Sequence, residues 1–436
     1  MFEAIDPRKV NPGFTSRPSI KSLKAKEEKT AADFNKELFT KSCKNSNHHI
    51  PKKIKIGSKI PLSRAAEAKP EKKIVNPAQI LKVDIVREKY GFTGRGVSVA
   101  VLDSGINHPE KPLKAWQDMV DDTPAWRGLL DESSIPIDPW GHGTHVAGNV
   151  NQMAPEADMV GIRVMDKTGA TNHSRIVKGI QWAIENKDKY NIKIINISLG
   201  DLPNPYGIPG PVEGAAYDAV KAGIVVVSSA GNEGPTPGSI SLPANKEEVI
   251  AVGSTLDSEH LAPSSSRGPA NGWLAKPDVL APGDLIKSWA SPDSEMVKIA
   301  VESAKIRALS GKELGRRIAK KPDLIATLGL PKNFAELSSR EKEAVVKKTL
   351  PQIYLTPDQG LIMSGTSFAA PEVAGVIALM FEANDDLSPK QVQQIIRETS
   401  RPLNDPSLGP NDQGKGLVDA LAAVEAALEL KKSKGA

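Results

Sequence analysis

The fold is decided by a nine-residue stretch, VSVAVLDSG, at residues 97–105. Its first six residues form an almost continuous apolar run of strand length, which is typical of a parallel strand buried on both faces. Asp103 follows at the carboxyl end of this strand, where open α/β sheets place their functional sites. Taken alone, an aspartate in this position is more typical of a turn or a helix cap. The role of Asp103 therefore depends on what the rest of the chain supplies.

Comparable apolar runs recur along the chain, at residues 159–164, 193–198, 224–229 and 249–252. Helical patterns lie between and after them, at residues 78–89, 143–151, 174–187, 212–222, 389–399 and 417–430, and also directly after Ser367. Strands that alternate with helices predict a parallel sheet joined by right-handed crossovers. We therefore predict an α/β protein of three layers, with a central parallel sheet flanked by helices.

Composition divides the chain of 436 residues into parts. Residues 1–75 hold 18 Lys or Arg against 8 Asp or Glu, and their Pro, Ser and Asn content with no sustained periodicity predicts a basic, mostly disordered extension over 1–76. The α/β body is expected over 77–430, followed by a basic tail at 431–436. Residues 290–358 interrupt the body, because they are rich in Lys and Glu and poor in strand patterns, which predicts a helical insertion.

Within the insertion, Ser338 and Glu341 have the spacing of a capping box for a helix that ends before Pro351. The insertion ends shortly before Ser367, so we expect its ends to lie near that residue. A lid, a substrate exosite and a partner-docking element are all compatible with this position. So is a surface insertion without function, because a long loop costs little closure entropy.

Several classes of protein are disfavoured. Cys43 is the single cysteine, so no internal disulfide framework can form. No run approaches the ~18 apolar residues that a membrane helix needs, which predicts no membrane span. Met1 precedes acidic and polar residues with no apolar segment of the kind found in a secretory signal, so a cytoplasmic location is expected, and export by another route stays open.

Three polar residues stand in glycine-rich or turn contexts that suit peptide hydrolysis by a hydroxyl. Such hydrolysis needs a nucleophile, a base, a carboxylate that orients the base, and donors for the oxyanion. His142 lies in GHGTHVAG at 141–148, where small neighbours let a substrate approach. Ser367 opens an apolar helix whose first amides favour a developing negative charge. Asn232 follows the strand at 224–229 and can donate from its amide group.

A second histidine, His145, lies one helical turn after His142. A zinc site would need another spacing, His-Glu-x-x-His, and a third ligand that the sequence does not supply. We expect His145 to be a packed structural histidine and assign no metal site.

Four segments, at residues 99–105, 141–148, 230–234 and 365–371, resemble the signature blocks of the subtilase family, and their order of Asp, His and Ser is that of subtilisin. The resemblance covers about residues 78–290 and 359–426 and implies a subtilisin-like fold.

The resemblance also implies roles for individual residues. It makes Asp103 the orienting carboxylate, His142 the general base and acid, and Ser367 the nucleophile of a catalytic triad, with Asn232 as the oxyanion donor. It further implies a strand-lined groove that pairs with an extended protein or peptide substrate by β-augmentation, built from Ser198, Leu199, Gly200, Ala230 and Gly231.

The sequence also departs from the family pattern. The stretch between Gly148 and Ala154 is too short for the calcium-binding loop that many subtilisins carry there, so no cofactor is expected to be required, although calcium elsewhere stays open. The basic extension lacks the apolar pattern of a compact propeptide, and we expect an inhibitory segment that the enzyme removes from itself. Glu233, beside Asn232, favours a weak preference for Lys or Arg before the cleaved bond.

The predicted function is that of a serine endopeptidase that acts through an acyl-enzyme and processes its own extension. Two alternatives belong to other classes. In the first alternative, the chain is a catalytically silent binding scaffold of the same fold. In the second, it is a protein that binds nucleic acid or another anionic surface through residues 1–75. A nucleic-acid partner is the less favoured of these, since a solvated arm has the same composition.

Overall fold

A computed structural model of the chain describes residues 74–108, 111–120, 136–201, 209–350 and 352–434. The predicted extension at 1–76 lies outside these residues, apart from its last three positions. The basic tail expected at 431–436 begins inside helix α16 (Ala420–Lys434), which continues the body through Lys434.

The core of the body is a seven-stranded sheet with the order β2-β3-β1-β4-β5-β6-β7. Every neighbouring pair in it is parallel, which confirms the predicted central parallel sheet. The strands are β1 (Ser98–Asp103), β2 (Ala115–Asp118), β3 (Asp158–Arg163), β4 (Ile192–Ile197), β5 (Val225–Ser229), β6 (Ile250–Thr255) and β7 (Val279–Pro282). The predicted stretch at 97–105 thus supplies β1, which lies between β3 and β4.

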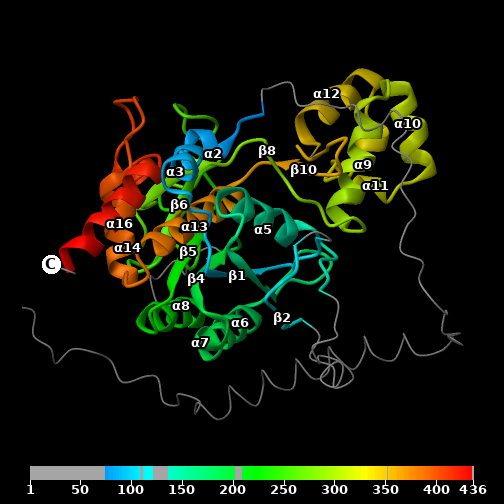
Figure 1. Ribbon diagram of the computed structural model, residues 1–436. Coiled ribbons are helices and arrows are strands. Elements are labelled where there is room, and N and C mark those ends of the chain that lie inside the picture. The colour runs from blue at the N-terminus through cyan, green and yellow to red at the C-terminus, as the bar shows by residue number, and fades with distance from the viewer. Residues whose placement is uncertain (1–73, 109–110, 121–135, 202–208, 351, 435–436) are drawn as a thin grey trace, which may run out of the picture. The chain divides into compact units, whose positions relative to one another are not determined.

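Both faces of β1 are buried, as its continuous apolar run predicts. Val99 and Val101 belong to one hydrophobic core, and Ala100 and Leu102 belong to the other. The first core is covered by α5 (His142–Met153) and α13 (Thr366–Ala383), and the second by α6 (His173–Glu185) and α8 (Pro211–Lys221). Helix, sheet and helix therefore form the three predicted layers (Figure 1).

The remaining helices of the body lie around these layers. They are α2 (Pro77–Ile80), α3 (Val83–Tyr90), α7 (Lys187–Tyr190), α14 (Pro389–Thr399), α15 (Pro410–Gln413) and α16. Of the helices in the described ranges, α13 is the one whose length and hydropathy would allow it to cross a membrane, and 89% of its apolar window is buried inside the protein. Its burial is that of a core helix.

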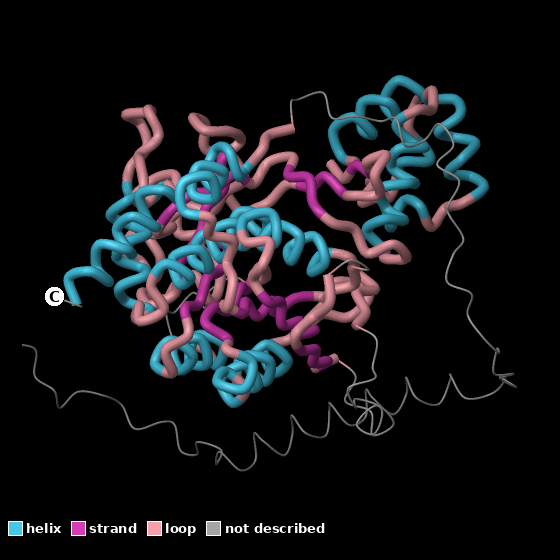
Figure 2. The backbone as a smooth tube through the Cα atoms, in the orientation of Figure 1, coloured by secondary structure: helices cyan, strands magenta, loops and turns pink. Residues whose placement is uncertain are grey.

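Residues 295–349 are mostly helical, as predicted for the insertion. They form α9 (Glu295–Arg307), α10 (Gly311–Lys320), α11 (Leu324–Thr327), a 3-10 turn (Phe334–Glu336) and α12 (Ser339–Thr349). These helices surround their own apolar core, which is separate from the two cores of the sheet. Figure 2 shows short strands where the chain enters and leaves the helices. They are β8 (Ile286–Ser288), β9 (Tyr354–Leu355) and β10 (Leu361–Met363), and β10 pairs antiparallel with the other two.

Candidate active site

The candidate site begins at the end of β1, where Asp103 is the last strand residue. Its side chain is fully buried, and one oxygen, Oδ1, accepts a hydrogen bond of 2.7 Å from the backbone N–H of Ser104. The other oxygen, Oδ2, is buried without a hydrogen-bond partner among the described residues. Burying an ionised carboxylate costs free energy unless a partner pairs with it. The group that pairs with Oδ1 of Asp103 therefore matters most for its stability.

That neighbour is His142, the first residue of α5. The Nδ1 atom of His142 lies 2.8 Å from Oδ1 of Asp103. Two glycines allow this approach. Gly141 caps the helix with φ of 102°, a conformation that side chains disfavour. A Cβ atom on Gly143 would lie 2.1 Å from the carbonyl oxygen of Gly105, so only glycine lets α5 approach the end of β1 so closely.

The pairing sets the tautomer of the histidine and raises its pKa. An ionised carboxylate can only accept a hydrogen bond, so the Nδ1 atom of His142 must carry the proton and donate it. In the neutral ring, Nε2 is then left as an acceptor. Burial by itself lowers the pKa of His142. The charge of Asp103 and the hydrogen bond to it outweigh burial, so the pKa lies above the ordinary value for histidine.

Ser367 stands at the second position of α13 and is half-buried. The ring of the next residue, Phe368, lies 5.3 Å from the ring of His142, which brings the start of α13 beside the start of α5. Nothing in the described ranges forms a hydrogen bond with the Ser367 hydroxyl. The structure thus joins Asp103 to His142 directly and brings Ser367 to the same place through its neighbour. Catalytic hydrogen bonds often tighten only once substrate is bound.

Asn232 is anchored to the same helix start. Its Oδ1 accepts hydrogen bonds from the backbone N–H of Thr366 at 2.9 Å and from the Thr366 hydroxyl at 3.1 Å. Since both partners donate, the amide oxygen faces α13 and the exposed NH2 group keeps its two donors for a ligand. The Ser367 N–H is one of the first four amides of the helix, which have no partner within the helix. Two kinds of donor therefore converge beside Ser367.

The five residues expected to line a substrate groove follow two neighbouring strands. Ser198, Leu199 and Gly200 come directly after β4, and Ala230 and Gly231 come directly after β5. Because β4 and β5 are adjacent and parallel, both segments lie at the carboxyl edge of the sheet, where Asp103 also lies. Gly200 is exposed, as is Glu233 beyond Asn232.

His145, also on α5, has other contacts than His142. It is fully buried, and its Nε2 lies 3.1 Å from the carbonyl oxygen of Ile286 and 3.2 Å from that of Leu361. Burial, followed by the charge of His142, lowers the pKa of His145 to about 3, so the ring is neutral. It is a packed histidine, as predicted. Among the described residues, no group of three or more His, Cys, Asp or Glu is arranged to hold a metal ion. Residues 148–153 are part of the unbroken helix α5.

The sequence reasoning missed Asp138. This aspartate is 2% exposed and accepts four hydrogen bonds, including those of the Gly141 and Thr144 backbone N–H groups at 2.7 and 2.8 Å. Burial raises the pKa of Asp138, while these hydrogen bonds oppose the rise. An aspartate that precedes a helix start is a common cap signal. Such a signal was present four residues before His142, although Pro139, Trp140 and Gly141 separate it from the helix.

Comparison with known proteins places this geometry in a family. Residues 94–416 match the profile of the Subtilase family. Serine protease AprX of Bacillus subtilis (strain 168) is 32% identical over 363 residues, which are 77% of this chain and 68% of AprX. Subtilisin E of the same organism is 35% identical over 211 residues, 45% of this chain and 49% of subtilisin E, so the chain spans about half the length of that relative.

Two further comparisons extend over more of the chain than the comparison with subtilisin E does. Subtilisin Savinase of Lederbergia lenta is 28% identical over 343 residues, 76% of this chain and 92% of the relative. A solved structure, that of a cold adapted subtilisin-like serine proteinase, aligns with a TM-score of 0.48 and 22% identity over 75% of this chain and 88% of the other. By the profile and by AprX, the chain belongs to the subtilase family of serine peptidases.

Proposed function

We propose that the chain is a serine endopeptidase that cleaves peptide bonds through an acyl-enzyme intermediate. The observation that carries this proposal is the buried hydrogen bond of 2.8 Å between Asp103 and His142, made beside the start of the helix that bears Ser367. The family of the chain supports it, since AprX, the relative named first above, is a serine protease by name.

In the proposed reaction, the Ser367 hydroxyl oxygen attacks the carbonyl carbon of the peptide and its proton passes to Nε2 of His142. Asp103 holds the ring in the Nδ1–H tautomer and stabilises the imidazolium that forms. The oxyanion receives hydrogen bonds from the Asn232 amide and the Ser367 N–H, with the positive end of the α13 dipole behind them.

The intermediate then collapses. The carbon–nitrogen bond breaks, His142 returns the proton to the leaving amine, and the acyl group stays on Ser367 until a water molecule, activated by the same histidine, releases it. Throughout these steps an extended substrate would pair with the backbone of 198–200 and 230–231 at the edge of the sheet.

A fluorophosphonate probe and an internally quenched peptide test this function together. We expect the wild-type protein to be labelled and to cleave the peptide, and Ser367→Ala to do neither. The labelled peptide should contain Ser367 when the protein is digested and its mass is measured. A folded wild-type protein that neither labels nor cleaves would instead support the silent-scaffold alternative.

We also propose that the enzyme removes its own basic extension, which lies outside the described residues. The support is charge: residues 1–75 carry 18 basic and 8 acidic residues, while the rest of the chain carries 39 basic and 44 acidic ones. A basic segment can therefore lie on an acidic body. Mass measurement of wild type beside Ser367→Ala should show the extension shortened only in wild type. Equal, intact N-termini together with unchanged activity after deletion of 1–75 would refute this proposal.

The basic extension is also the basis of the remaining alternative, an anionic-surface or nucleic-acid binder. It predicts binding that weakens steeply with salt and that residues 1–75 alone reproduce. Glu233 adds a finer proposal, a weak preference for Lys or Arg before the cleaved bond, because its carboxylate is exposed beside Asn232. A peptide-library profile with only large apolar residues at that position would exclude the preference.

A further inference from the structure

Asp138 joins the two elements that carry Asp103 and His142. Its Oδ1 accepts hydrogen bonds from the Ser104 hydroxyl at 2.8 Å and the Gly141 N–H at 2.7 Å. Its Oδ2 accepts from the N–H and the hydroxyl of Thr144 at 2.8 and 2.6 Å. One side chain thus holds the residue that follows Asp103, the residue that precedes His142, and the first turn of α5.

Ser104 extends this contact into a closed arrangement. While its hydroxyl donates to Asp138, its oxygen accepts a hydrogen bond of 2.9 Å from the Gly143 N–H. Gly143 directly follows His142, and Ser104 directly follows Asp103. Hydrogen bonds to the residues before and after His142 therefore connect the start of α5 to the end of β1. They flank the contact of 2.8 Å between His142 Nδ1 and Asp103 Oδ1.

The backbone of the same loop is held from its other side by the entry to the insertion. The Ser291 hydroxyl donates to the Asp138 carbonyl oxygen at 2.8 Å. The first N–H groups of α9, those of Glu295 and Met296, donate to the carbonyl oxygens of Pro139 and Trp140, both at 3.0 Å. The loop that presents Asp138 is consequently fixed by contacts that do not involve its carboxylate.

We propose that Asp138 is a positioning residue for the reaction, which sets the distance and orientation between Asp103 and His142. The inference rests on the proposed function. A helix cap needs one acceptor for one or two amides. Asp138 satisfies four donors from three residues and links a strand end to a helix start, which is more than capping requires.

The charge of Asp138 gives the proposal a readout that a purely structural role would lack. The charged or titratable groups that act on His142 are Asp103 from β1, Asp138 from the loop and His145 from α5. Asp138 adds to the rise in the pKa of His142. Removing its charge should therefore lower that pKa and move the acid limb of the kcat/KM profile to lower pH, because the neutral base then persists to lower pH.

The test compares Asp138→Asn with wild type in the full chain. The amide keeps the shape but turns one acceptor into a donor that faces other donors. We expect kcat to fall about 10- to 100-fold, the order of loss that a misplacement near 1 Å causes, with KM little changed. The acid limb should move to lower pH. The ring of His142, followed by NMR as pH is changed, should titrate at lower pH as well, and this measurement does not need turnover.

Three further variants separate positioning from folding. Asp419→Asn changes another buried aspartate, which directly precedes helix α16 and accepts a hydrogen bond of 3.1 Å from the Ala422 N–H in its first turn. Helix α16 carries none of the site residues. The Asp419→Asn variant should lower stability without moving kcat or the pH limb. Thr144→Val removes one donor to Asp138, together with the acceptor of the Asn107 N–H at 3.0 Å, and should lower kcat without lowering the pKa of His142. Thr144→Ser keeps the hydroxyl and should keep kcat near that of wild type.

The outcomes are distinct. If Asp138→Asn behaves like Asp419→Asn, with lower stability but wild-type kcat, pH limb and His142 titration, Asp138 is only a structural cap and the inference is wrong. If wild type shows no Ser367-dependent hydrolysis, the proposed function fails instead. The His142 titration still decides in that case whether Asp138 acts on the histidine.

Discussion

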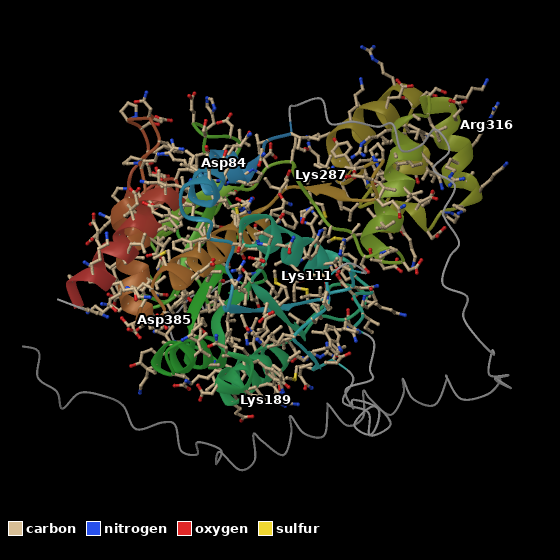
Figure 3. All side chains as sticks on the ribbon, in the orientation of Figure 1. Asp84, Lys111, Lys189, Lys287, Arg316 and Asp385 are labelled. Carbon is tan, nitrogen blue, oxygen red and sulfur yellow. The ribbon has the colours of Figure 1, made fainter. Side chains whose placement is uncertain are left out.

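The end of β1 with the start of α5, and the helical insertion at 295–349, are built on opposite principles. Around His142 the buried groups include polar side chains that directional hydrogen bonds hold in place, as Asp138 and Asp103 show. Inside the insertion most of the buried groups are apolar, with Phe334 and Leu314 fully enclosed, although Ser303 and Lys342 are also buried. Most of its charged side chains are exposed, and Arg316 on α10 points away from the protein (Figure 3).

This difference teaches where each region is vulnerable. Hydrogen bonds in a buried polar network depend on direction, so a small change alters geometry before it unfolds the chain. Apolar packing is non-directional and proportional to area, so a change there costs stability before it alters any particular distance. Substitutions near His142 should therefore appear as changes in rate, and substitutions in the insertion as changes in stability.

The largest effect is expected for Asp103→Asn. The amide has the size of the carboxylate but favours the wrong tautomer of His142, so under the proposed function kcat should fall about 10⁴-fold, the loss that this substitution causes in a serine protease with an Asp-His-Ser triad. The midpoint of thermal unfolding should stay unchanged, because the substitution removes a buried charge whose Oδ2 has no partner in the described structure. A steady-state assay beside calorimetry measures both. A loss of stability comparable to the loss of rate would break the comparison.

The next effect should come from Phe334→Ala in the insertion. Its ring is fully buried, and truncating such a ring costs about 3–5 kcal/mol. We expect the loss to be local, with faster amide hydrogen exchange across α10 and α12 and unchanged exchange in β1 and β4. Cleavage by an added protease should begin in 295–349. Equal loss of protection in the sheet would show that the two regions unfold as one.

A smaller, pH-dependent effect is expected for Glu372→Gln. Glu372 lies in α13, where it is fully buried and both carboxylate oxygens lack partners among the described residues. Burial raises its pKa well above the ordinary value of 4.5. Below that value both the folded and unfolded chains hold the proton, so wild type and variant should have the same stability.

As pH rises, the unfolded chain releases this proton while the folded chain retains it, so wild type loses stability until the folded pKa is passed. Glu372→Gln removes this dependence. Thermal unfolding at pH 8 should therefore show the variant with the higher midpoint, and the gap should close at pH 4. Glu382→Gln, in the same helix, is the contrasting control. The Glu382 carboxylate accepts hydrogen bonds from the backbone N–H groups of Thr93 and Gly94 at 2.6 Å, so this change should lower the stability of the protein.

The smallest effect is expected for Ser338→Ala at the start of α12. The Ser338 hydroxyl accepts from the Glu341 N–H at 3.3 Å, and the Glu341 carboxylate accepts from the Ser338 N–H at 2.8 Å. Losing one half of this capping box should cost about 1 kcal/mol. Hydrogen exchange at the first turn of α12 measures the loss, and Ser338→Thr should retain most of the stability. No change in kcat is expected from either variant.

Local signals explain what could be predicted from sequence. Helix α14 begins and ends at the predicted residues, since Ser388 caps it in a capping box with Gln391 and Pro389 occupies its first turn. The predicted box of Ser338 with Glu341 is also formed. Such signals work because cap and helix are neighbours in the chain, so no distant contact is needed to satisfy them.

Other features depend on distant contacts and were missed. Strand β7 carries Pro282 and lies at the edge of the sheet, the position where a strand tolerates proline, yet the sequence does not show which strand is at the edge. The role of Asp138 was missed because its partner Ser104 lies 34 residues away. The site residues were grouped by their resemblance to a family, whereas their distances required the folded chain.

The paired strands at the base of the insertion have a consequence for how this chain can change. Leu361 is in register with Ser288 and Met363 with Ile286, and the Gly365 N–H donates to the Gly283 carbonyl oxygen at 2.7 Å. The chain therefore leaves the body and returns to it at one point, which these paired strands and the Gly365 hydrogen bond close two residues before Ser367. We expect that the segment between these paired strands can be lengthened, shortened or replaced without a shift of Ser367. The replacement must still supply the two N–H donors that Glu295 and Met296 now give to the loop before His142.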